Sequence, residues 1–122
     1  MCPVYINRIA SIHAESRNEK PYFSAQEPDY KEMITNANLR RRMSRMIKMG
    51  VACGLECLKD IPSEKVDAII TATGLGCLAD TEKFMNALMD NREQMLNPTA
   101  FIQSTFNTVG AQLALLLKIH AY

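Results

Sequence analysis

The feature of this sequence that most constrains the fold is a stretch that is apolar on almost every side. Residues 109–118 are VGAQLALLLK, in which only Gln112 and Lys118 are polar. In a helix, Leu113, Leu116 and Leu117 would lie on adjacent faces, so no single orientation would leave only polar side chains exposed. The sequence therefore predicts a buried apolar helix here, enclosed by a larger body.

Length and composition bound the possible functions. The chain has 122 residues, which suits a single domain over 1–122, and its 14 basic against 13 acidic residues give a net charge of +1. That balance disfavours a general nucleic-acid binder. No apolar run approaches the about 20 residues of a membrane helix, and the first residues do not resemble a secretory signal. We therefore expect a cytoplasmic protein that binds neither nucleic acid nor membrane.

The apolar pattern predicts strands and helices in alternation. Two stretches rich in β-branched residues, 3–12 and 66–73, are expected to form strands, the second buried on both faces. Helices are expected over three stretches: 39–59, 80–91 and 109–118. Loops are expected over 13–38 and 101–108. This order predicts an α/β fold in layers, with a largely parallel sheet and right-handed crossovers.

Glycines stand out at two places. Gly50 and Gly54 are one turn apart on the inner face of the helix at 39–59, where they would let another backbone approach closely. Gly74 and Gly76 follow an expected strand, as in a phosphate-binding loop. Two carboxylates in the next helical turn would repel a phosphate, however: Asp80 and Glu82. A tight turn is therefore the preferred interpretation of the second pair.

A basic cluster lies at the start of the helix predicted over 39–59. Arg40, Arg41, Arg42, Arg45 and Lys48 place five positive charges within nine residues, with no acidic residue between them. On one helix, Arg41, Arg45 and Lys48 would share an outer stripe. The cluster is either a solvated helix face or a docking patch for an acidic partner. Nucleic acid is disfavoured because no aromatic residues are interleaved.

The sequence holds no recognisable catalytic or metal-binding motif. His13 and His120 are not part of a Cys–His or Ser–His pattern. Cys53 and Cys57 could face the same way on a helix, but two further metal ligands are missing. A helix N-terminus could activate Cys77, but the acidic residues that follow it oppose this. We therefore expect no metal, no cofactor and no catalytic residue.

Four segments, in this order, nevertheless resemble one enzyme family. They are RRMSRMIKMG at 41–50, DAIITATGLGCL at 67–78, DTEKF at 80–84 and NPTAFIQSTFNTVGAQ at 97–112. Together they cover most of residues 39–118 and are similar to the N-terminal half of β-ketoacyl synthases. These are the thiolase-fold condensing enzymes of fatty-acid and polyketide assembly. Within the family, the chain most resembles bacterial synthase-like proteins of polyene-type clusters.

The resemblance has consequences for fold and site. It implies a partial thiolase-like fold, and it implies carrier-protein binding by Arg41, Arg42 and Arg45. A substrate or interface loop is implied for five residues: Phe101, Gln103, Ser104, Thr105 and Asn107. None of the four cysteines matches the family's nucleophile, and the chain is expected to end before the strand that leads to it. The two histidines that assist condensation lie in the family's second half.

Two classes of function follow from the resemblance. The chain is either the N-terminal part of a β-ketoacyl synthase, inactive by itself as an acyltransferase, or a non-catalytic interaction module. As a module it would dock an acyl carrier protein or pair with a complete synthase. An unrelated third interpretation is a small regulator that acts through its basic helix. The apolar helix at 109–118 also predicts a homo-oligomer, or attachment to a fuller synthase.

Overall fold

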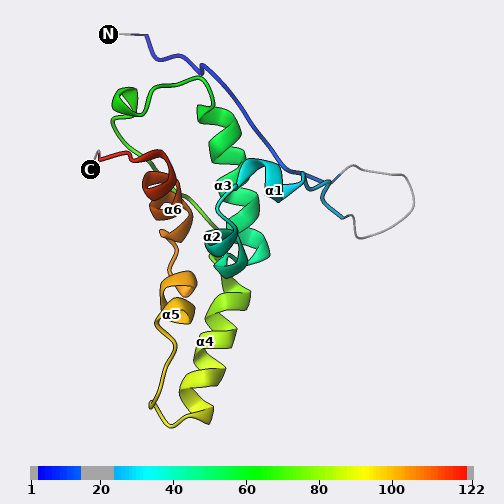
Figure 1. Cartoon of the computed structure of the whole chain (residues 1–122), viewed down its shortest axis with the longest axis vertical. Coiled ribbons are helices and arrows are strands. Elements are labelled where there is room, and N and C mark those ends of the chain that lie inside the picture. The colour runs from blue at the N-terminus through cyan, green and yellow to red at the C-terminus, as the bar shows by residue number, and fades with distance from the viewer. Residues whose placement is uncertain (1–2, 15–23, 121–122) are drawn as a thin grey trace.

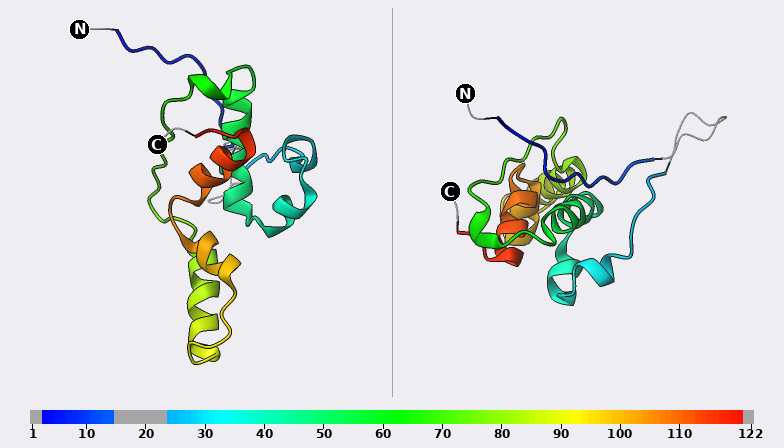
Figure 2. Two further views of the ribbon diagram at one scale, coloured as in Figure 1. Left: turned by 60° about the vertical axis from the view of Figure 1, so that its left-hand side comes forward. Right: turned by 90° about the horizontal axis from the view of Figure 1, so that it is seen from above.

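The computed structural model describes residues 3–14 and 24–120, and helices dominate this part of the chain. Two tiers follow the long axis (Figure 1 and Figure 2): α3 lies beside α6 in one, and α4 lies beside α5 in the other. The short α1 and α2 precede α3, and α1 packs against it. The helices are α1 (Tyr30–Met33), α2 (Ala37–Arg42), α3 (Arg45–Leu58), the 3-10 helix η1 (Ser63–Lys65), α4 (Leu78–Asp90), α5 (Pro98–Ser104) and α6 (Thr108–Leu117).

Side-chain caps explain where three of these helices begin. The Oδ1 atom of Asp29 accepts from the Lys31 amide at the start of α1. Asn36 caps α2 in the same way through the amides of residues 38 and 39. Asn97 caps α5, and Pro98 occupies the first helical turn, where its missing N–H is no loss. The caps satisfy amides that have no partner within their own helix.

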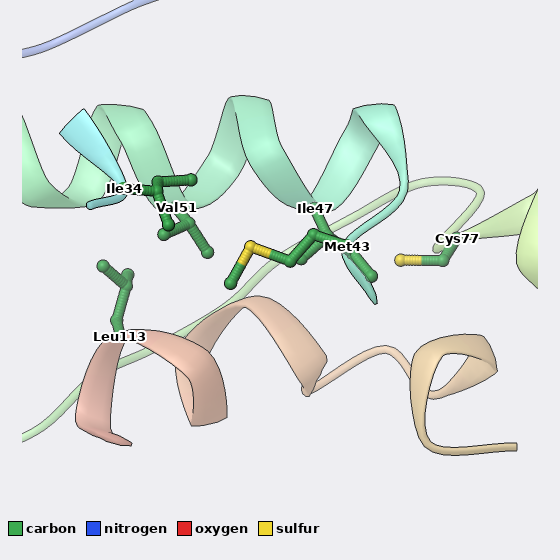
Figure 3. Close-up of a cluster of buried hydrophobic side chains, with 6 residues drawn as sticks. All are labelled: Ile34, Met43, Ile47, Val51, Cys77 and Leu113. Carbon is green, nitrogen blue, oxygen red and sulfur yellow. The ribbon is translucent and has the colours of Figure 1, made fainter. Parts of the chain in front are cut away.

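The core lies between α3 and its neighbours. Ile47 and Val51 of α3 are fully buried, and the adjoining cluster residues are Ile34, Met43, Cys77 and Leu113 (Figure 3). A Cβ atom added at Gly54 would come within 2.4 Å of a Leu113 methyl, and one added at Gly50 would come within 2.8 Å of Val109. The two glycines do allow a close approach by α6, but the atoms nearest to them belong to the side chains of Val109 and Leu113 and not, as predicted, to a backbone.

The predicted α/β fold with a largely parallel sheet is wrong for the described residues. They contain no strand, and their β pairing is one isolated antiparallel bridge between Ala14 and Ala25. The predicted strands at 3–12 and 66–73 lack secondary structure, with Val4 97% and Ile70 91% exposed. Strand propensity mainly measures how well a side chain fits a pleated, half-buried surface. In the described structure neither segment pairs with another strand, so neither forms part of such a surface.

Both predicted loops contain helix. The segment predicted as a loop over 13–38 includes α1 and the start of α2, and the one over 101–108 includes most of α5. The helix predicted over 39–59 is interrupted, because Met43 is extended with ψ 133° and Ser44 precedes a new helix. The predictions over 80–91 and 109–118 are confirmed as α4 and α6, with ends shifted by one or two residues.

The apolar helix α6 is only partly enclosed. Leu113 is buried, Leu116 and Leu117 pack against the core cluster, and Leu115 is 67% exposed. Residues 69–71 cover another side, because a Cβ atom added at Gly110 would meet the Thr71 hydroxyl at 2.8 Å. In the described part of the chain, no helix by itself has the length and apolar character to cross a membrane. Among the described residues, α5 and α6 have that length and apolar character when they are taken together, but they form a pair bent by 106°.

Candidate functional site

The basic cluster lies across the junction of α2 and α3. Arg41 and Arg42 end α2, and Arg45 begins α3. Because Met43 and Ser44 separate the two helices, the prediction that Arg41, Arg45 and Lys48 share a stripe on one helix is wrong. The arginines of α2 are nevertheless well placed electrostatically, whereas Arg45 lies at the partly positive N-terminal end of α3. The last turn of a helix carries partial negative charge, which the arginines of α2 complement.

The arginines of α2 differ in what they contact. Arg40 is half-buried, and its guanidinium donates to the carbonyl of Ile34, which ties the end of α1 to α2. Arg41 is exposed and donates to the Asn38 side chain at 2.6 Å, within its own helix. Arg42 is also exposed. Arg41 and Arg42 thus face solvent with no acidic residue bonded to either in the described structure.

Arg45 is engaged by an acidic residue that the sequence analysis did not single out. Its Nε atom forms an ion pair with Glu27, and the Tyr30 hydroxyl donates to the other Glu27 oxygen at 2.6 Å. The hydrogen bond from Tyr30, followed by that from Arg45, holds the pKa of Glu27 below its usual range. Burial and the same hydrogen bond raise the pKa of Tyr30. Arg45 therefore fastens the segment before α1 to α3.

Residues 101–107, predicted as a substrate or interface loop, form the end of α5 and the corner that leads to α6. Phe101 stacks at a tilt on Phe84 of α4, with ring centroids 5.5 Å apart. The hydroxyl of Ser104 donates to the Phe101 carbonyl at 2.7 Å, and that of Thr105 donates to the Ile102 carbonyl at 2.8 Å. Gln103 is half-buried, and Asn107 is exposed where α6 begins.

A buried hydroxyl holds this corner closed. Thr108 is 2% exposed, donates to the Ile102 carbonyl, and lies 2.9 Å from the Thr105 hydroxyl. From α4, the Thr81 hydroxyl donates to the Ser104 carbonyl at 3.3 Å. The five predicted residues all lie within 101–107 at this corner, and Ser104 and Thr105 direct their hydroxyl groups at the backbone. In this arrangement, the hydroxyl groups of Ser104 and Thr105 stabilise the backbone of the corner.

Within the described residues, two of the thiols lie in surroundings that disfavour the thiolate. Burial, and then the nearby Asp80 carboxylate, raise the pKa of the Cys77 thiol, and burial raises that of Cys53. The His13 ring lies 3.2 Å from the hydroxyl of Ser11, two residues away on an exposed segment. Among residues 3–14 and 24–120, no three potential metal ligands gather in one place.

The geometry of these residues does not by itself identify a protein family, but a comparison with known proteins does. A family model described as beta-ketoacyl synthase, N-terminal domain, matches residues 13–121, which is most of the chain. No curated protein sequence matches the chain. The match includes the basic cluster, the turn at 74–76 and the corner between α5 and α6. The chain therefore belongs to the β-ketoacyl synthase N-terminal domain family.

Proposed function

We propose that this chain serves a β-ketoacyl synthase of fatty-acid or polyketide biosynthesis by docking an acyl carrier protein, and that it does not catalyse condensation alone. The observation that carries the proposal is the exposed pair Arg41 and Arg42 at the junction of α2 and α3. Family membership supports the role, and the positive surface suits an acidic partner. We place this role in the cytoplasm, which suits the free thiols of Cys53, Cys57 and Cys77.

The docking surface consists of Arg41 and Arg42, with Arg45 at its edge. Arg45 contributes less free charge than the other two, because Glu27 neutralises part of it. Exposed charges of this kind mainly set the rate of encounter and its dependence on salt. Each is worth about 0.5–1 kcal/mol of binding free energy at low salt. The interaction is therefore expected to be weak and to fade as salt is added.

Charge reversal tests the docking role. The double variant Arg41→Glu, Arg42→Glu should abolish binding to an acidic acyl carrier protein, measured by titration calorimetry or by NMR shifts at low salt. A matched control is Lys65→Glu, Lys83→Glu, which makes the same change in net charge at two other exposed sites. The proposal fails if both double variants weaken binding equally, or if affinity is indifferent to both the charge reversal and salt.

The absence of catalysis has a direct test. A nucleophilic cysteine needs a stabilised thiolate, and the pKa of the buried Cys77 is raised instead. Incubation with an acyl thioester should therefore leave the intact mass of the chain unchanged. Stoichiometric acylation of Cys77 would overturn this part of the proposal.

A second candidate role is pairing with another copy of the chain or with a complete synthase. It is favoured by large apolar side chains exposed on α5, α6 and the corner between them: Phe101, Ile102, Phe106 and Leu115. Burying apolar area is worth about 25 cal/mol for each Å². If α6 is at the contact, Leu115→Glu should shift light scattering towards the monomer, whereas Met89→Glu on α4, at a similar exposure of 72%, should not. A wild-type chain that is monomeric at micromolar concentration excludes self-pairing.

A further inference from the structure

Two thiols of α3 face the same extended segment of the chain. Cys53 and Cys57 are one helical turn apart, and both are half-buried free thiols. The Cys57 thiol donates to the Arg8 carbonyl at 3.6 Å. Burial raises the pKa of Cys53, and a backbone hydrogen bond from Ile12 opposes this rise. Because the backbone of residues 8–12 contacts both sulfur atoms, the two thiols lie on one side of α3.

Helical spacing decides what these two thiols can form. Residues four apart on a helix have Cβ atoms about 5–6 Å apart. A disulfide needs its Cβ atoms at about 3.5–4.5 Å, so an unbroken α3 keeps Cys53 and Cys57 from forming one. A linear bridge through one metal ion spans about 4.6 Å between the sulfur atoms, at about 2.3 Å for each bond from metal to thiolate. The pair therefore suits a shared ion better than a disulfide.

The number and softness of the ligands select the ion. A structural zinc site needs four ligands, and in the part of the chain that the structure describes no three His, Cys, Asp or Glu side chains gather in one place. Monovalent copper prefers soft thiolates, and two of them complete a linear site. The Met33 thioether, another soft donor, lines the same cavity of about 550 Å³ as Cys53. This cavity also gives an ion from solvent access to Cys53.

The surroundings of the two thiols offset the charge of such a complex. A monovalent copper ion held by two thiolates has one net negative charge. The Arg8 guanidinium lies near enough to Cys57 to interact with its charge, although its main partner is Asp60 at 2.6 Å. The backbone amide of Ile12 favours the charged form of Cys53. The positive charge of the metal itself deprotonates a coordinated thiol, which overcomes the effect of burial.

We propose that Cys53 and Cys57 form a binding site for one monovalent copper ion on α3. The two sulfur atoms are the ligands, and residues 8–12 cover them. Two thiols and one Cu⁺ give a copper dithiolate and two protons that pass to water, so the step needs no oxidant or reductant. This inference does not depend on carrier-protein docking, because Arg41 and Arg42 lie on α2 and take no part in it.

Anaerobic titration of the whole chain with copper(I), in competition with a coloured copper(I) chelator, tests the proposal. The control variant Cys2→Ser, Cys77→Ser keeps only these two of the four cysteines and should bind one ion per chain. In that background, Cys53→Ser or Cys57→Ser should each weaken binding by more than about 100-fold, because losing even an outer-shell partner costs 10–100-fold. A serine variant that binds copper as tightly as its parent would overturn the proposal, and so would zinc bound as tightly as copper.

Alkylation gives a second measurement in which neither ligand is replaced. In the Cys2→Ser variant, one equivalent of copper(I) should suppress the reaction of N-ethylmaleimide with Cys53 and Cys57 together, as mapped by peptide mass spectrometry. Cys77 lies apart from α3 and is 6% exposed, so its rate of alkylation should not change. Protection of one α3 thiol without the other would refute a shared ion. Equal slowing at all three thiols would refute the site, because it would indicate copper bound without preference.

Discussion

The close contact between α3 and α6 makes a sharp prediction about Gly54. A Cβ atom at this position would lie 2.4 and 2.7 Å from the two methyl carbons of Leu113 and 3.1 Å from its Cγ atom. Carbon atoms this close repel strongly, because optimal contacts lie at about 3.5–4.0 Å. Leu113 is buried, so its side chain has little room to rotate away. The Gly54→Ala variant must therefore move Leu113 or separate the helices.

The size of the effect follows from two opposing terms. Replacing glycine by alanine inside a helix stabilises it by about 1 kcal/mol. Forcing an extra carbon into a packed core costs about 1–3 kcal/mol. With three Leu113 atoms inside ordinary contact distance, the cost belongs in the upper part of that range. Gly54→Ala should therefore lower the free energy of unfolding by about 1–2 kcal/mol, although helix propensity alone predicts a gain.

Urea unfolding followed by far-UV circular dichroism measures this, with Gly74→Ala as the control. A Cβ atom at Gly74 meets nothing within 4 Å, so that variant should be neutral or slightly stabilising. Leu113→Ala removes the obstacle and itself costs about 2–5 kcal/mol. In that background, Gly54→Ala should become stabilising by about 1 kcal/mol, which gives a coupling free energy of about 2–3 kcal/mol. A Gly54→Ala protein more stable than the wild type would refute the reasoning.

Three further predictions concern the hydroxyl, carboxyl and thiol groups. Tyr30→Phe removes the largest cause of the low pKa of Glu27, so that pKa, measured by NMR, should rise towards its ordinary value. Because a lowered carboxyl pKa stabilises the fold above the unfolded pKa and the effect is lost as pH falls through the folded one, the variant should lose less stability between pH 7 and about pH 3. Thr108→Val should cost about 1 kcal/mol in urea unfolding, because the Ile102 carbonyl keeps a second donor. Iodoacetamide should alkylate Cys77 faster in Asp80→Asn than in the wild type, because the Asp80 charge contributes to the raised thiol pKa.

Helices were predictable where the apolar residues within a segment recur clearly at helical spacing. The apolar spacing of α3, α4 and α6 is contained in each stretch itself, and the structure forms all three. The missed helices also carried local signals. Asn97 and Pro98 precede the segment predicted as a loop, yet Asn at the cap followed by Pro at the first position is a helix start. Asp29 and Asn36 are caps of the same kind for α1 and α2.

The strands could not be judged from their own residues. β-Branched side chains at 3–12 and 66–73 are compatible with a strand, but a strand exists only through hydrogen bonds to another segment. In the described structure the segment at 3–12 is instead fastened to α3 and the residues after it. Arg8 forms an ion pair with Asp60 at 2.6 Å, and the Cys57 thiol donates to the Arg8 carbonyl at 3.6 Å. Neither contact has a signature in the sequence, because each joins residues about fifty positions apart.

The candidate site was predictable as a set of residue types and not as a geometry. The density of arginines identified the basic cluster, but its shape depends on Met43, whose side chain is 5% exposed in the core. Met43 is extended, α2 ends before it and α3 begins at Arg45, so the arginines do not lie on one helix. Asp80 was interpreted as a carboxylate that would repel a phosphate near Gly74 and Gly76. That interpretation assumes a carboxylate in water, whereas Asp80 is only 8% exposed in the structure. In both cases the residue was interpreted from its neighbours in the sequence, whereas its role depends on burial by other parts of the chain.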